Sequence, residues 1–562
     1  MKKRGCAAEA ALLSLLLAGC GAADPSASAV TSAKTEAAAE TTQAQETTAA
    51  QMETLSAALS ADKEEGNCRT GYEIFVRSFY DSNGDGIGDL AGVEEKLPYI
   101  ADTMGFDEIW LMPICPSPSY HKYDVTDYED VDSEYGTLAD YESLVKACHD
   151  RGVTVLNDLV LNHTSSEHPW FLAAQKYLES LPAGEEPDPS VCPCVDYYNF
   201  SDTAQDGYAA LPGTDWFYEA RFSDSMPDLN LDSEAVRGEI SDIVRFWLNE
   251  GADGFRLDAV TSYYTESAEK TIAFLTWLND TVKEIKPDAY LVGEAWTDQK
   301  TYASYYASGV DSFFDFAFSG SEGDVAKLAR GKLSALTFGQ AMEDEEALYA
   351  SVNPDYVNAP FYTNHDMARS AGYFTQDADG SKTKFAGALN LLQQGNAFVY
   401  YGEELGMKGS GKDENKRAPM YWSADADEAG MCDPPPGMDS FDMKFPSEAE
   451  QAEDPLSIRN YFQAAVRIRN AFGALRSGDT KVFSDLSDHD VLVFSRTDAD
   501  HSTTPVLVAV NAGEEETQVD LAGEGAFFDT LSAVLTVDAQ EVDLSGTVLT
   551  LPSHAMAFLT GQ

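Results

Sequence analysis

Residues 254–260 read GFRLDAV, and residues 290–296 read YLVGEAW. Each is a short, mostly apolar run with a carboxylate near its end, Asp258 in the first and Glu294 in the second. Runs of this length, rich in aliphatic and aromatic residues, are typical of strands buried on both faces of a parallel sheet. Charged groups are rarely placed in such strands without a task, so the two carboxylates mark a candidate functional site.

Similar runs recur along the chain and alternate with stretches of helical periodicity. Apolar residues step by three and four between Leu90 and Met104, and again between Val236 and Trp247. This alternation predicts an α/β fold, a (β/α)8 TIM barrel of eight parallel strands. An open, doubly wound sheet is the alternative, but it seldom spreads eight strands over so long a segment. The expected strands are Glu73–Phe79, Glu108–Pro113, Thr154–Val160, Gly254–Ala259, Tyr290–Ala295, Val310–Phe316, Ala359–Thr363 and Ala397–Tyr401.

The barrel is expected to comprise residues 67–163 and 231–479. Residues 164–230 lie between these parts and are rich in Asp, Pro, Tyr and Gly. Because a structureless loop of this length is uncommon, we expect a small inserted domain, domain B, after the third strand. Residues 480–562 contain short strand-like runs separated by turn residues, which predicts a C-terminal antiparallel β-sandwich.

The N-terminus carries a targeting pattern. Residues 1–20 begin with a basic cluster, continue with an apolar stretch and end in LAGC at Cys20, which resembles the lipobox of bacterial lipoproteins. We therefore expect a lipoprotein signal peptide, lipidation of Cys20 and an exported protein anchored to the cell membrane, facing outside the cytoplasm. An ordinary signal peptide with a chance cysteine is the alternative. Residues 21–66 contain no aromatic residue and are rich in Ala, Thr, Ser, Glu and Gln, so they are expected to form a disordered tether.

The composition of the chain argues against several classes of binding partner. The chain has 37 basic and 95 acidic residues, a formal charge of −58, and a surface this negative repels nucleic acid and anionic lipid. Outside the N-terminus no window approaches about 18 apolar residues, so membrane contact is expected through the lipid anchor only. The cysteines are scattered, which argues against a zinc site, and their pairing stays open.

Four strand ends together resemble the conserved regions of glycoside hydrolase family 13, the α-amylase family. They read DLVLNH at 158–163, GFRLDAV at 254–260, GEAW at 293–296 and NHD at 364–366, in order and at barrel-appropriate spacing. The likeness extends from about Gly71 to the C-terminus. The MPDLN segment at 226–230 looks intermediate between oligo-1,6-glucosidases and neopullulanases, and its polar residues are expected to be structural.

The resemblance implies a retaining α-glucan hydrolase with Asp258 as nucleophile, Glu294 as general acid/base and Asp366 as transition-state stabiliser. Retention requires two carboxyls about 5–5.5 Å apart, one ionised and one protonated. Arg256 lies two residues before Asp258 on one strand, so it shares that side of the strand and should keep the carboxylate ionised. The apolar neighbours of Glu294 should raise its pKa. For a single carboxylate, a strand-end ion pair is the alternative.

The resemblance also implies substrate contacts. His163 and His365 would bond sugar hydroxyls, Tyr123 would stack on the sugar at the cleavage point, and His121 would supply a polar contact beside it. A buried structural tyrosine is the alternative for Tyr123.

The loop after the first strand reads DSNGDGIGD at 81–89. It offers side-chain oxygens of Asp81, Asn83, Asp85 and Asp89 and the backbone carbonyl of Ile87, a spacing similar to the front half of an EF-hand. The bidentate glutamate of that motif is replaced by Gly92. We expect a structural Ca2+ that clamps the loop; Mg2+ and an empty hydrogen-bonded turn are the alternatives.

Departures from the family pattern bear on specificity. Tyr120 stands where exo-acting α-glucosidases usually have an aspartate, which favours an open cleft, and Ala259 resembles enzymes that prefer α-1,4 bonds. Thr261-Ser262 replaces the Lys-His pair of standard α-amylases, which puts a second calcium in doubt. We expect internal cleavage of α-1,4 bonds in starch-like glucans and maltooligosaccharides. An exo-acting α-glucosidase, a neopullulanase/cyclomaltodextrinase-like enzyme and a non-catalytic glucan-binding lipoprotein are the alternatives.

Overall fold

The computed structural model describes residues 53–55, 68–182, 184–265, 267–498 and 502–561, all within one compact unit, Thr48–Gln562. The predicted signal peptide, its Cys20 and most of the predicted tether lie outside the described residues. No helix in the described part of the chain is both long and apolar enough to cross a membrane.

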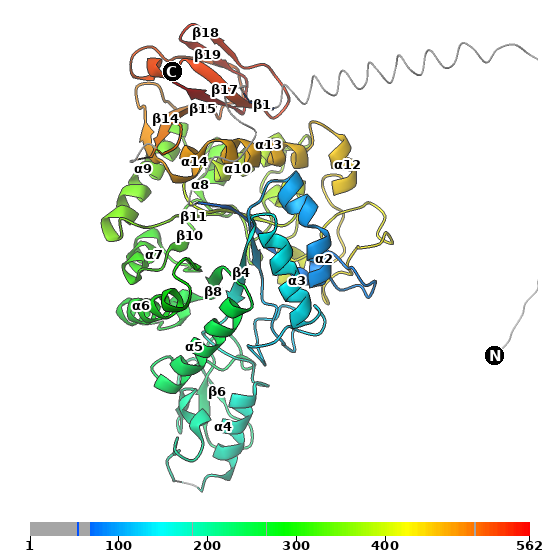
Figure 1. Cartoon of the computed structure of the whole chain (residues 1–562), viewed down its shortest axis with the longest axis vertical. Coiled ribbons are helices and arrows are strands. Elements are labelled where there is room, and N and C mark those ends of the chain that lie inside the picture. The colour runs from blue at the N-terminus through cyan, green and yellow to red at the C-terminus, as the bar shows by residue number, and fades with distance from the viewer. Residues whose placement is uncertain (1–52, 56–67, 183, 266, 499–501, 562) are drawn as a thin grey trace, which may run out of the picture. The chain divides into compact units, whose positions relative to one another are not determined.

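Eight parallel strands form the centre of the structure (Figure 1). Their order is β11-β10-β9-β8-β4-β3-β2-β12, and a parallel bridge between Phe361 and Phe398 joins the two end strands, so the sheet closes on itself. The predicted (β/α)8 barrel is therefore confirmed. The strands are β2 (Thr70–Ile74), β3 (Glu108–Leu111), β4 (Thr154–Leu159), β8 (Gly254–Leu257), β9 (Tyr290–Gly293), β10 (Ser312–Asp315), β11 (Ala359–Pro360) and β12 (Ala397–Tyr400).

The first strand was predicted with the wrong bounds. Residues 73–79 were expected to be extended, but β2 ends at Ile74 and Val76–Ser78 form a 3-10 turn. The reason is register: β2 pairs with β12 from Thr70 to Glu73, and the β12 strand ends at Tyr400. The apolar run beyond Ile74 is buried above the strand rather than within it. Glu73 consequently stands one residue from the carboxyl end of β2.

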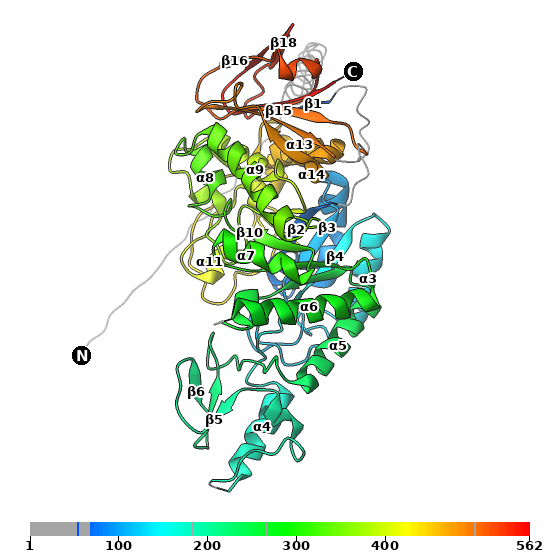
Figure 2. The same ribbon diagram turned by 90° about the vertical axis from the view of Figure 1, so that its left-hand side faces the viewer.

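Helices cover the outside of the barrel (Figures 1 and 2). The α5 helix illustrates why these segments are helical, since the Ser233 side chain caps it by accepting from Val236 N and its apolar side is buried from Val236 to Trp247. The helices are α2 (Leu90–Glu95), α3 (Leu138–His149), α5 (Glu234–Asn249), α6 (Ala268–Ile285), α7 (Gln299–Tyr305), α8 (Asp324–Ala329), α9 (Ala335–Val352), α10 (Ser381–Leu391), α11 (Asp413–Lys416), α12 (Glu448–Glu453), α13 (Ile458–Ala471) and α14 (Gly473–Ser477), with a π-helical turn at Pro98–Thr103.

The segment between β4 and α5 forms the small inserted unit that the sequence predicts. It contains α4 (Pro169–Ser180), a 3-10 helix η3 (Pro193–Asp196) and a three-stranded antiparallel sheet of β5 (Phe200–Ser201), β7 (Phe217–Glu219) and β6 (Tyr208–Ala210). Phe171 of α4 packs edge-on against Tyr198 and Tyr218 and gives the unit its own aromatic core. Figures 1 and 2 place this unit and the C-terminal sheets on opposite sides of the barrel.

Two antiparallel sheets follow the barrel. One has the order β1-β17-β20-β15-β14-β13 and the other β16-β19-β18, and a separate cluster of apolar side chains lies between them. The strands are β13 (Asp479–Val482), β14 (Val491–Thr497), β15 (Val506–Asn511), β16 (Thr517–Asp520), β17 (Thr530–Leu535), β18 (Asp543–Ser545), β19 (Val548–Leu551) and β20 (Ala555–Thr560).

The predicted tether at 21–66 needs a correction at β1 (Glu53–Leu55). These three residues pair antiparallel with Ala533–Leu535 of β17 and are therefore an edge strand. Composition alone indicated that the segment buries too little surface to order itself. A sheet edge changes that balance, because its unpaired N–H and C=O groups accept a short strand whatever its side chains.

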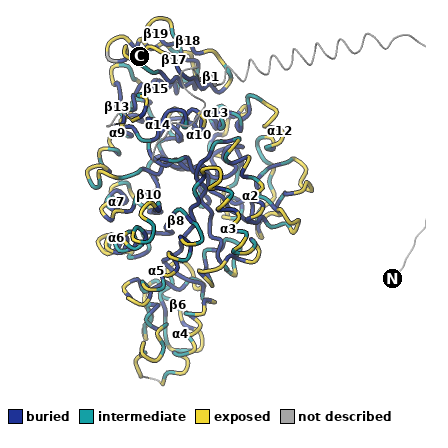
Figure 3. The backbone as a smooth tube through the Cα atoms, in the orientation of Figure 1, coloured by how far each residue is buried: buried dark blue, intermediate teal, exposed yellow. Residues whose placement is uncertain are grey.

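The buried residues are concentrated in the barrel strands and in the inward faces of the helices (Figure 3). Close packing leaves no space for side chains at some points; a Cβ on Gly254 of β8 would lie 1.9 Å from Tyr290 O of the neighbouring strand. Against this apolar interior stand several buried charged groups, including Glu73, Asp158, Arg256, Asp258 and Glu294. All of them lie at or near the carboxyl ends of barrel strands, where this fold builds its sites.

Candidate active site

Asp258 and Glu294 meet at one guanidinium. Arg256, on β8, is fully buried; its Nη1 donates to Asp258 Oδ1 at 2.7 Å and its Nη2 lies 3.5 Å from Glu294 Oε2. Both carboxyls are 8% exposed, so they open onto solvent only slightly. The two acids therefore point to the same end of the barrel, as the sequence predicts.

The backbone after Asp258 is bent sharply. Ala259 has φ 51° and ψ 46°, in the left-handed region that residues with a Cβ rarely adopt. Its N–H donates to Glu294 Oε2 at 3.1 Å. Non-glycine residues in this region cost of the order of 1 kcal/mol or more, and such conformations are found where a site needs a particular backbone orientation. Here the bend links the loop after β8 directly to the carboxyl on β9.

Glu294 is the acid of the pair. Burial, and next the charges of Asp258 and Asp366, raise its pKa to about 7, against the opposing effect of Arg256. A carboxyl with such a pKa is protonated in a large fraction of molecules near neutrality and can donate a proton. The sequence attributed this to the apolar neighbours Ala295 and Trp296, but Trp296 is 52% exposed, so burial of the carboxyl itself is the cause.

Asp366 is held as an anion. Burial alone would raise its pKa, but His365 and then Arg417 outweigh it and hold the pKa well below its usual range. The contacts are short: Arg417 Nη2 donates to Oδ1 at 2.8 Å and His365 Nε2 lies 3.1 Å from Oδ2. With 35% of its side chain exposed, Asp366 is the most open of the three acids.

His365 is fully buried within a chain of polar groups. Nδ1 lies 2.5 Å from Glu73 Oε1 and Nε2 lies 2.7 Å from Tyr123 Oη. Burial would lower its pKa, but Asp366 and Glu73 outweigh burial and raise the pKa to about 9. The imidazolium thus neutralises part of the negative charge of the site. Tyr123 stacks on the imidazole with an interplanar angle of 17° and remains half-buried.

The polar chain continues to Asp158 on β4. Tyr123 Oη donates to Asp158 Oδ2 at 3.1 Å, and Trp110 Nε1 donates to the same oxygen at 3.2 Å. Arg256 Nη1 lies 2.8 Å from Oδ1, so one arginine contacts three carboxyls. Burial raises the pKa of Asp158, and the Arg256 charge opposes this rise.

The structure brings most of the predicted contact residues to this centre, with differences in detail. His163 is buried, and its Nε2 donates to the backbone carbonyl of Tyr123 at 3.2 Å instead of facing open space. His121 is half-buried; its Nδ1 accepts from Tyr123 N at 3.2 Å and lies 3.1 Å from Ser119 Oγ. Both imidazoles therefore hydrogen-bond to the backbone of Tyr123.

Sequence reasoning missed three members of the site. Glu73 is a charged residue inside an apolar strand, which is the same signal that identified Asp258. The predicted strand, Glu73–Phe79, places this residue at the beginning of the strand, whereas it lies near the carboxyl end of β2. Trp110 could be recognised only as a core aromatic. Arg417 follows β12 in a polar stretch without a motif, and only the structure places it against Asp366.

Two hollows lie beside Asp366 and Tyr120. One, of about 480 Å3, is lined by Asp366, Phe316, Tyr373 and Trp296, whose rings include a Trp296–Phe316 stack at 5.2 Å. The other, of about 650 Å3, is lined by Tyr120, His121 and the Lys412–Glu414 segment. Arg417 Nη1 donates to Tyr120 Oη at 3.2 Å while Nη2 bonds Asp366, so one arginine links the linings of the two hollows.

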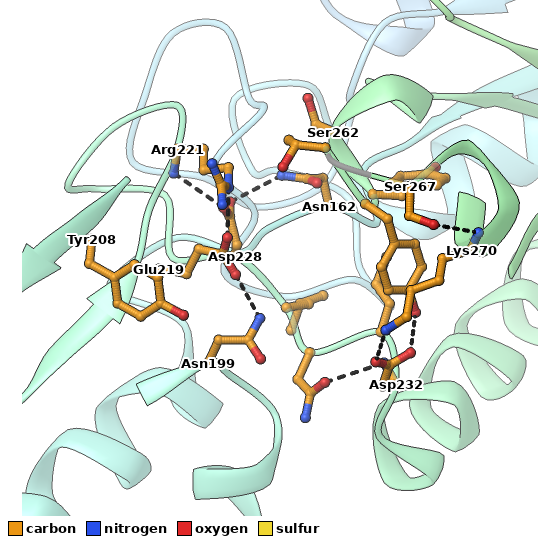
Figure 4. Close-up of a pocket in the computed structure, with 16 residues that line it drawn as sticks. Asn162, Asn199, Tyr208, Glu219, Arg221, Asp228, Asp232, Ser262, Ser267 and Lys270 are labelled. Carbon is orange, nitrogen blue, oxygen red and sulfur yellow. Dashed lines mark hydrogen bonds and ion pairs between the residues drawn. The ribbon is translucent and has the colours of Figure 1, made fainter. Parts of the chain in front are cut away.

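A third pocket, of about 360 Å3, lies between the inserted unit and the loop after β8 (Figure 4). Asn162 Nδ2 and Arg221 N both donate to the Asp228 carboxylate, and Arg221 Nε donates to Glu219 at 2.6 Å. Burial raises the pKa of Asp228 to about 7. These contacts hold the inserted unit against the end of β4, in keeping with the structural part that the sequence predicts for residues 226–230.

The loop at 81–89 is folded around its own carboxylates. Asp81 accepts from the N–H groups of Asn83, Gly84 and Gly86, and Asp85 accepts from Ile87 N at 2.8 Å. Asp89 accepts from Ser82 and caps α2 through Gly92 N. Asp81 Oδ1 and both carboxylate oxygens of Asp89 each accept two hydrogen bonds within the loop. The donors are all oxygens, the type that a hard cation prefers, but a bound ion would have to replace some of these hydrogen bonds. In the described residues no three His, Cys, Asp or Glu side chains are gathered as metal ligands.

Two neighbouring carboxyls at the carboxyl end of a (β/α)8 barrel, one of them with a raised pKa, are typical of a glycoside hydrolase. Comparison with known proteins agrees: the α-amylase catalytic domain family matches residues 73–478. The chain belongs to this family, glycoside hydrolase family 13.

The similar proteins include both α-amylases and oligo-1,6-glucosidases. Alpha-amylase 3 of Dictyoglomus thermophilum is 37% identical over 416 residues, covering 72% of this chain and 78% of that protein. Oligo-1,6-glucosidase of Heyndrickxia coagulans is 29% identical over 537 residues, covering 80% and 92%. Among solved structures, Eubacterium rectale Amy13B has 47% identity and a TM-score of 0.87, covering 90% of this chain and 98% of that one. The α-amylase of H. orenii has 32% identity and a TM-score of 0.76, covering 89% and 100%. The chain is thus an α-glucan hydrolase of this family.

Proposed function

We propose that this chain is an extracellular, lipid-anchored retaining hydrolase that cleaves internal α-1,4-glucosidic bonds of starch-like glucans and maltooligosaccharides. The observation that carries the chemistry is the contact of both Asp258 and Glu294 with the single guanidinium of Arg256. This contact brings the two carboxyls together on neighbouring strands at one barrel end, and burial raises the pKa of Glu294 to about 7.

Double displacement follows from this arrangement. The Asp258 carboxylate attacks the anomeric carbon, the glycosidic C–O bond breaks, and the Glu294 proton passes to the leaving oxygen. The resulting glycosyl ester is then hydrolysed: Glu294, now a carboxylate, takes a proton from water, and the water oxygen displaces Asp258. Asp366 stays ionised throughout and bonds sugar hydroxyls of the distorted, positively charged transition state. Tyr123 offers its half-buried ring to the apolar face of that sugar.

The two hollows, one lined by Asp366 and the other by Tyr120, support internal cleavage. A glucan bound across the site has space to continue past Trp296 in one direction and past His121 in the other. An exo-acting enzyme needs one side closed by a polar group on the terminal sugar. Tyr120 occupies the expected position of that group, and its hydroxyl is already bonded to Arg417.

Product analysis tests the cleavage mode. With amylose, early release of maltose and longer oligomers supports internal cleavage, whereas glucose as the sole early product contradicts it. Pullulan and isomaltose, assayed in parallel, report the α-1,4 against α-1,6 preference and address the exo-glucosidase and neopullulanase-like alternatives. Asp258→Asn should lower kcat on a chromogenic maltooligosaccharide by at least about a thousandfold. Equal rates for the variant and wild type would support a non-catalytic binding protein.

The proposal includes the N-terminal anchor at Cys20. Cells grown with labelled palmitate should incorporate the label into wild type but not into Cys20→Ser, and the variant should leave the membrane fraction. An unlabelled wild-type protein would remove the anchor from the proposal without affecting the proposed chemistry.

The proposal also includes a structural Ca2+ held by Asp81, Asn83, Asp85, Asp89 and the Ile87 carbonyl. When bound, the ion would supply charge neutralisation to the loop after β2. The loop is joined to the rest of the barrel through Asp81 N, which donates to Gly430 O, and through Asp433 N, which donates to Gly86 O.

A further inference from the structure

The inserted unit carries two cysteines in the sequence Val191-Cys192-Pro193-Cys194. All six cysteines of the described residues are free thiols, and four of them, Cys68, Cys115, Cys148 and Cys432, are buried. Cys192 and Cys194 alone among these six are partly exposed. Only accessible thiols react readily with disulfides in solution, because the attacking species is a thiolate that must reach its partner.

The two thiols lie together. Cys192 is the residue before η3 (Pro193–Asp196), with an extended backbone at φ −134°, and Cys194 is within the first turn. The Cys192 thiol lies close enough to the Cys194 thiol to contribute to the rise of its pKa. On its other side Cys192 Sγ donates to Ala173 O of α4 at 3.8 Å. Two cysteines with Pro193 between them therefore share one small patch of surface.

The pair is chemically asymmetric. Burial, and next the charge of Cys192, raise the pKa of the Cys194 thiol to about 11. A thiol with a pKa this high is rarely ionised near neutrality, so we assign the first attack to Cys192. Cys194 then acts as the group that resolves a mixed disulfide.

From this juxtaposition we propose that Cys192 and Cys194 form a redox-active dithiol that is reversibly oxidised to a disulfide by small or protein disulfides. The Cys192 thiolate attacks a disulfide RSSR, forming a mixed disulfide and releasing one thiolate RS⁻. The Cys194 thiolate then attacks the Cys192 sulfur, forming the intramolecular S–S bond and releasing the second RS⁻. Two electrons pass to RSSR, and the two cysteine protons end on the two RSH molecules.

Hydrogen bonds connect the segment that carries the two cysteines to helix α5 of the barrel. Asp196, at the other end of η3, accepts from Ser233, which caps α5, and its carbonyl accepts from Asn230 Nδ2 at 3.0 Å. Tyr197 follows and donates to Glu239 of α5 at 2.7 Å. The dithiol is therefore one short helix away from the segment that returns to the barrel. An exposed disulfide is also reduced more readily than a buried structural one, so the oxidation is reversible.

Peptide mapping of the full chain tests the proposal. Reduced, folded protein is incubated with oxidised glutathione, quenched in acid and treated with N-ethylmaleimide under denaturing conditions. Trypsin cuts at Lys176 and Arg221, and the peptide between them contains Cys192 and Cys194 as its only cysteines. We expect this peptide two hydrogens lighter and unlabelled, while the peptides of Cys115, Cys148 and Cys432 carry N-ethylmaleimide. Dithiothreitol should restore labelling without denaturant.

Two single variants distinguish a dithiol from two independent thiols. Cys194→Ser should accumulate a glutathione adduct at Cys192, because no resolving thiol remains. Cys192→Ser should react at least about tenfold more slowly, because the pKa of the remaining Cys194 thiol is raised. The proposal is overturned if wild type gives a doubly glutathionylated or fully N-ethylmaleimide-labelled peptide, or if the two variants react at equal rates. Both variants keep the carboxylates of the barrel, so activity on a maltooligosaccharide reports that they are folded.

Discussion

His365 Nδ1 lies 2.5 Å from Glu73 Oε1, although 292 positions separate the two residues along the chain. The contact joins the carboxyl ends of the first and seventh barrel strands. After Asp366, Glu73 is the next charge that raises the pKa of His365, and the imidazolium lies 3.1 Å from Asp366. Glu73 therefore acts on the substrate-facing acid through a histidine that never reaches solvent.

Glu73→Gln should keep the hydrogen bond but remove the charge. We expect the pKa of His365 to fall from about 9, since Glu73 is among the causes of its rise. The resulting loss of positive charge beside Asp366 should lower kcat/KM on maltooligosaccharides by roughly tenfold, about 1.4 kcal/mol. Imidazole NMR measures the histidine pKa directly. A variant with unchanged histidine titration but lowered activity would show that Glu73 acts only by packing.

The pH dependence of the rate should report Glu294. Its pKa is about 7 in the free enzyme, and the protonated form is the one that donates. Raising the pH through that value removes the acid, so kcat/KM should fall on the alkaline side with an apparent pKa near 7. The measurement is a kcat/KM profile on a maltooligosaccharide with a poor leaving group.

A matched pair of substrates isolates the proton transfer. Glu294→Gln should lose at least about a hundredfold in rate on a natural oligosaccharide. On a glucoside with an acidic nitrophenol leaving group the loss in the first step should be far smaller, because such a leaving group needs no proton. Equal losses on both substrates would assign Glu294 a structural task.

The sequence was sufficient for the fold because the strands are strongly apolar and the helices keep their period over several turns. It also located Asp258, Glu294 and Asp366, each of which follows a strand in a recognisable segment. Glu73 and Arg417 could not be assigned in this way, since their importance lies in pairs formed across the barrel by register. The same holds for β1: its pairing depends on the free edge of β17, some 480 residues further along the chain, and not on its own composition.

Removal of Ca2+ should destabilise the loop after β2. A cation at a hundredfold excess over its dissociation constant stabilises the native state by about 2.7 kcal/mol, so chelation should lower Tm, and added Ca2+ should restore it. Asp85→Asn removes one exposed ligand charge and should weaken the effect, whereas Asp242→Asn, an exposed aspartate on α5, should leave it unchanged. If Tm is the same with and without chelator in wild type, the loop is a hydrogen-bonded turn.

Trp296 should act as a platform for glucan units beyond the cleaved bond. It is 52% exposed, stacks on Phe316 at 5.2 Å and lines the hollow that reaches Asp366. Aromatic stacking contributes about 0.5–1.5 kcal/mol, so Trp296→Ala should lower kcat/KM on long maltooligosaccharides by up to roughly tenfold. The shortest cleavable oligosaccharide, which does not reach the hollow, should be affected much less.

Phe527→Ala provides the matched control for this substitution. Phe527 is 59% exposed and lies among the C-terminal sheets. The substitution therefore removes an exposed aromatic ring without changing the barrel. The two variants are compared on a series of maltooligosaccharides of increasing length. A length-dependent loss confined to Trp296→Ala supports the platform, because each added sugar gains contact only where the ring lies. A uniform loss at every length would instead mean that Trp296 supports the position of Glu294, two residues earlier in the chain.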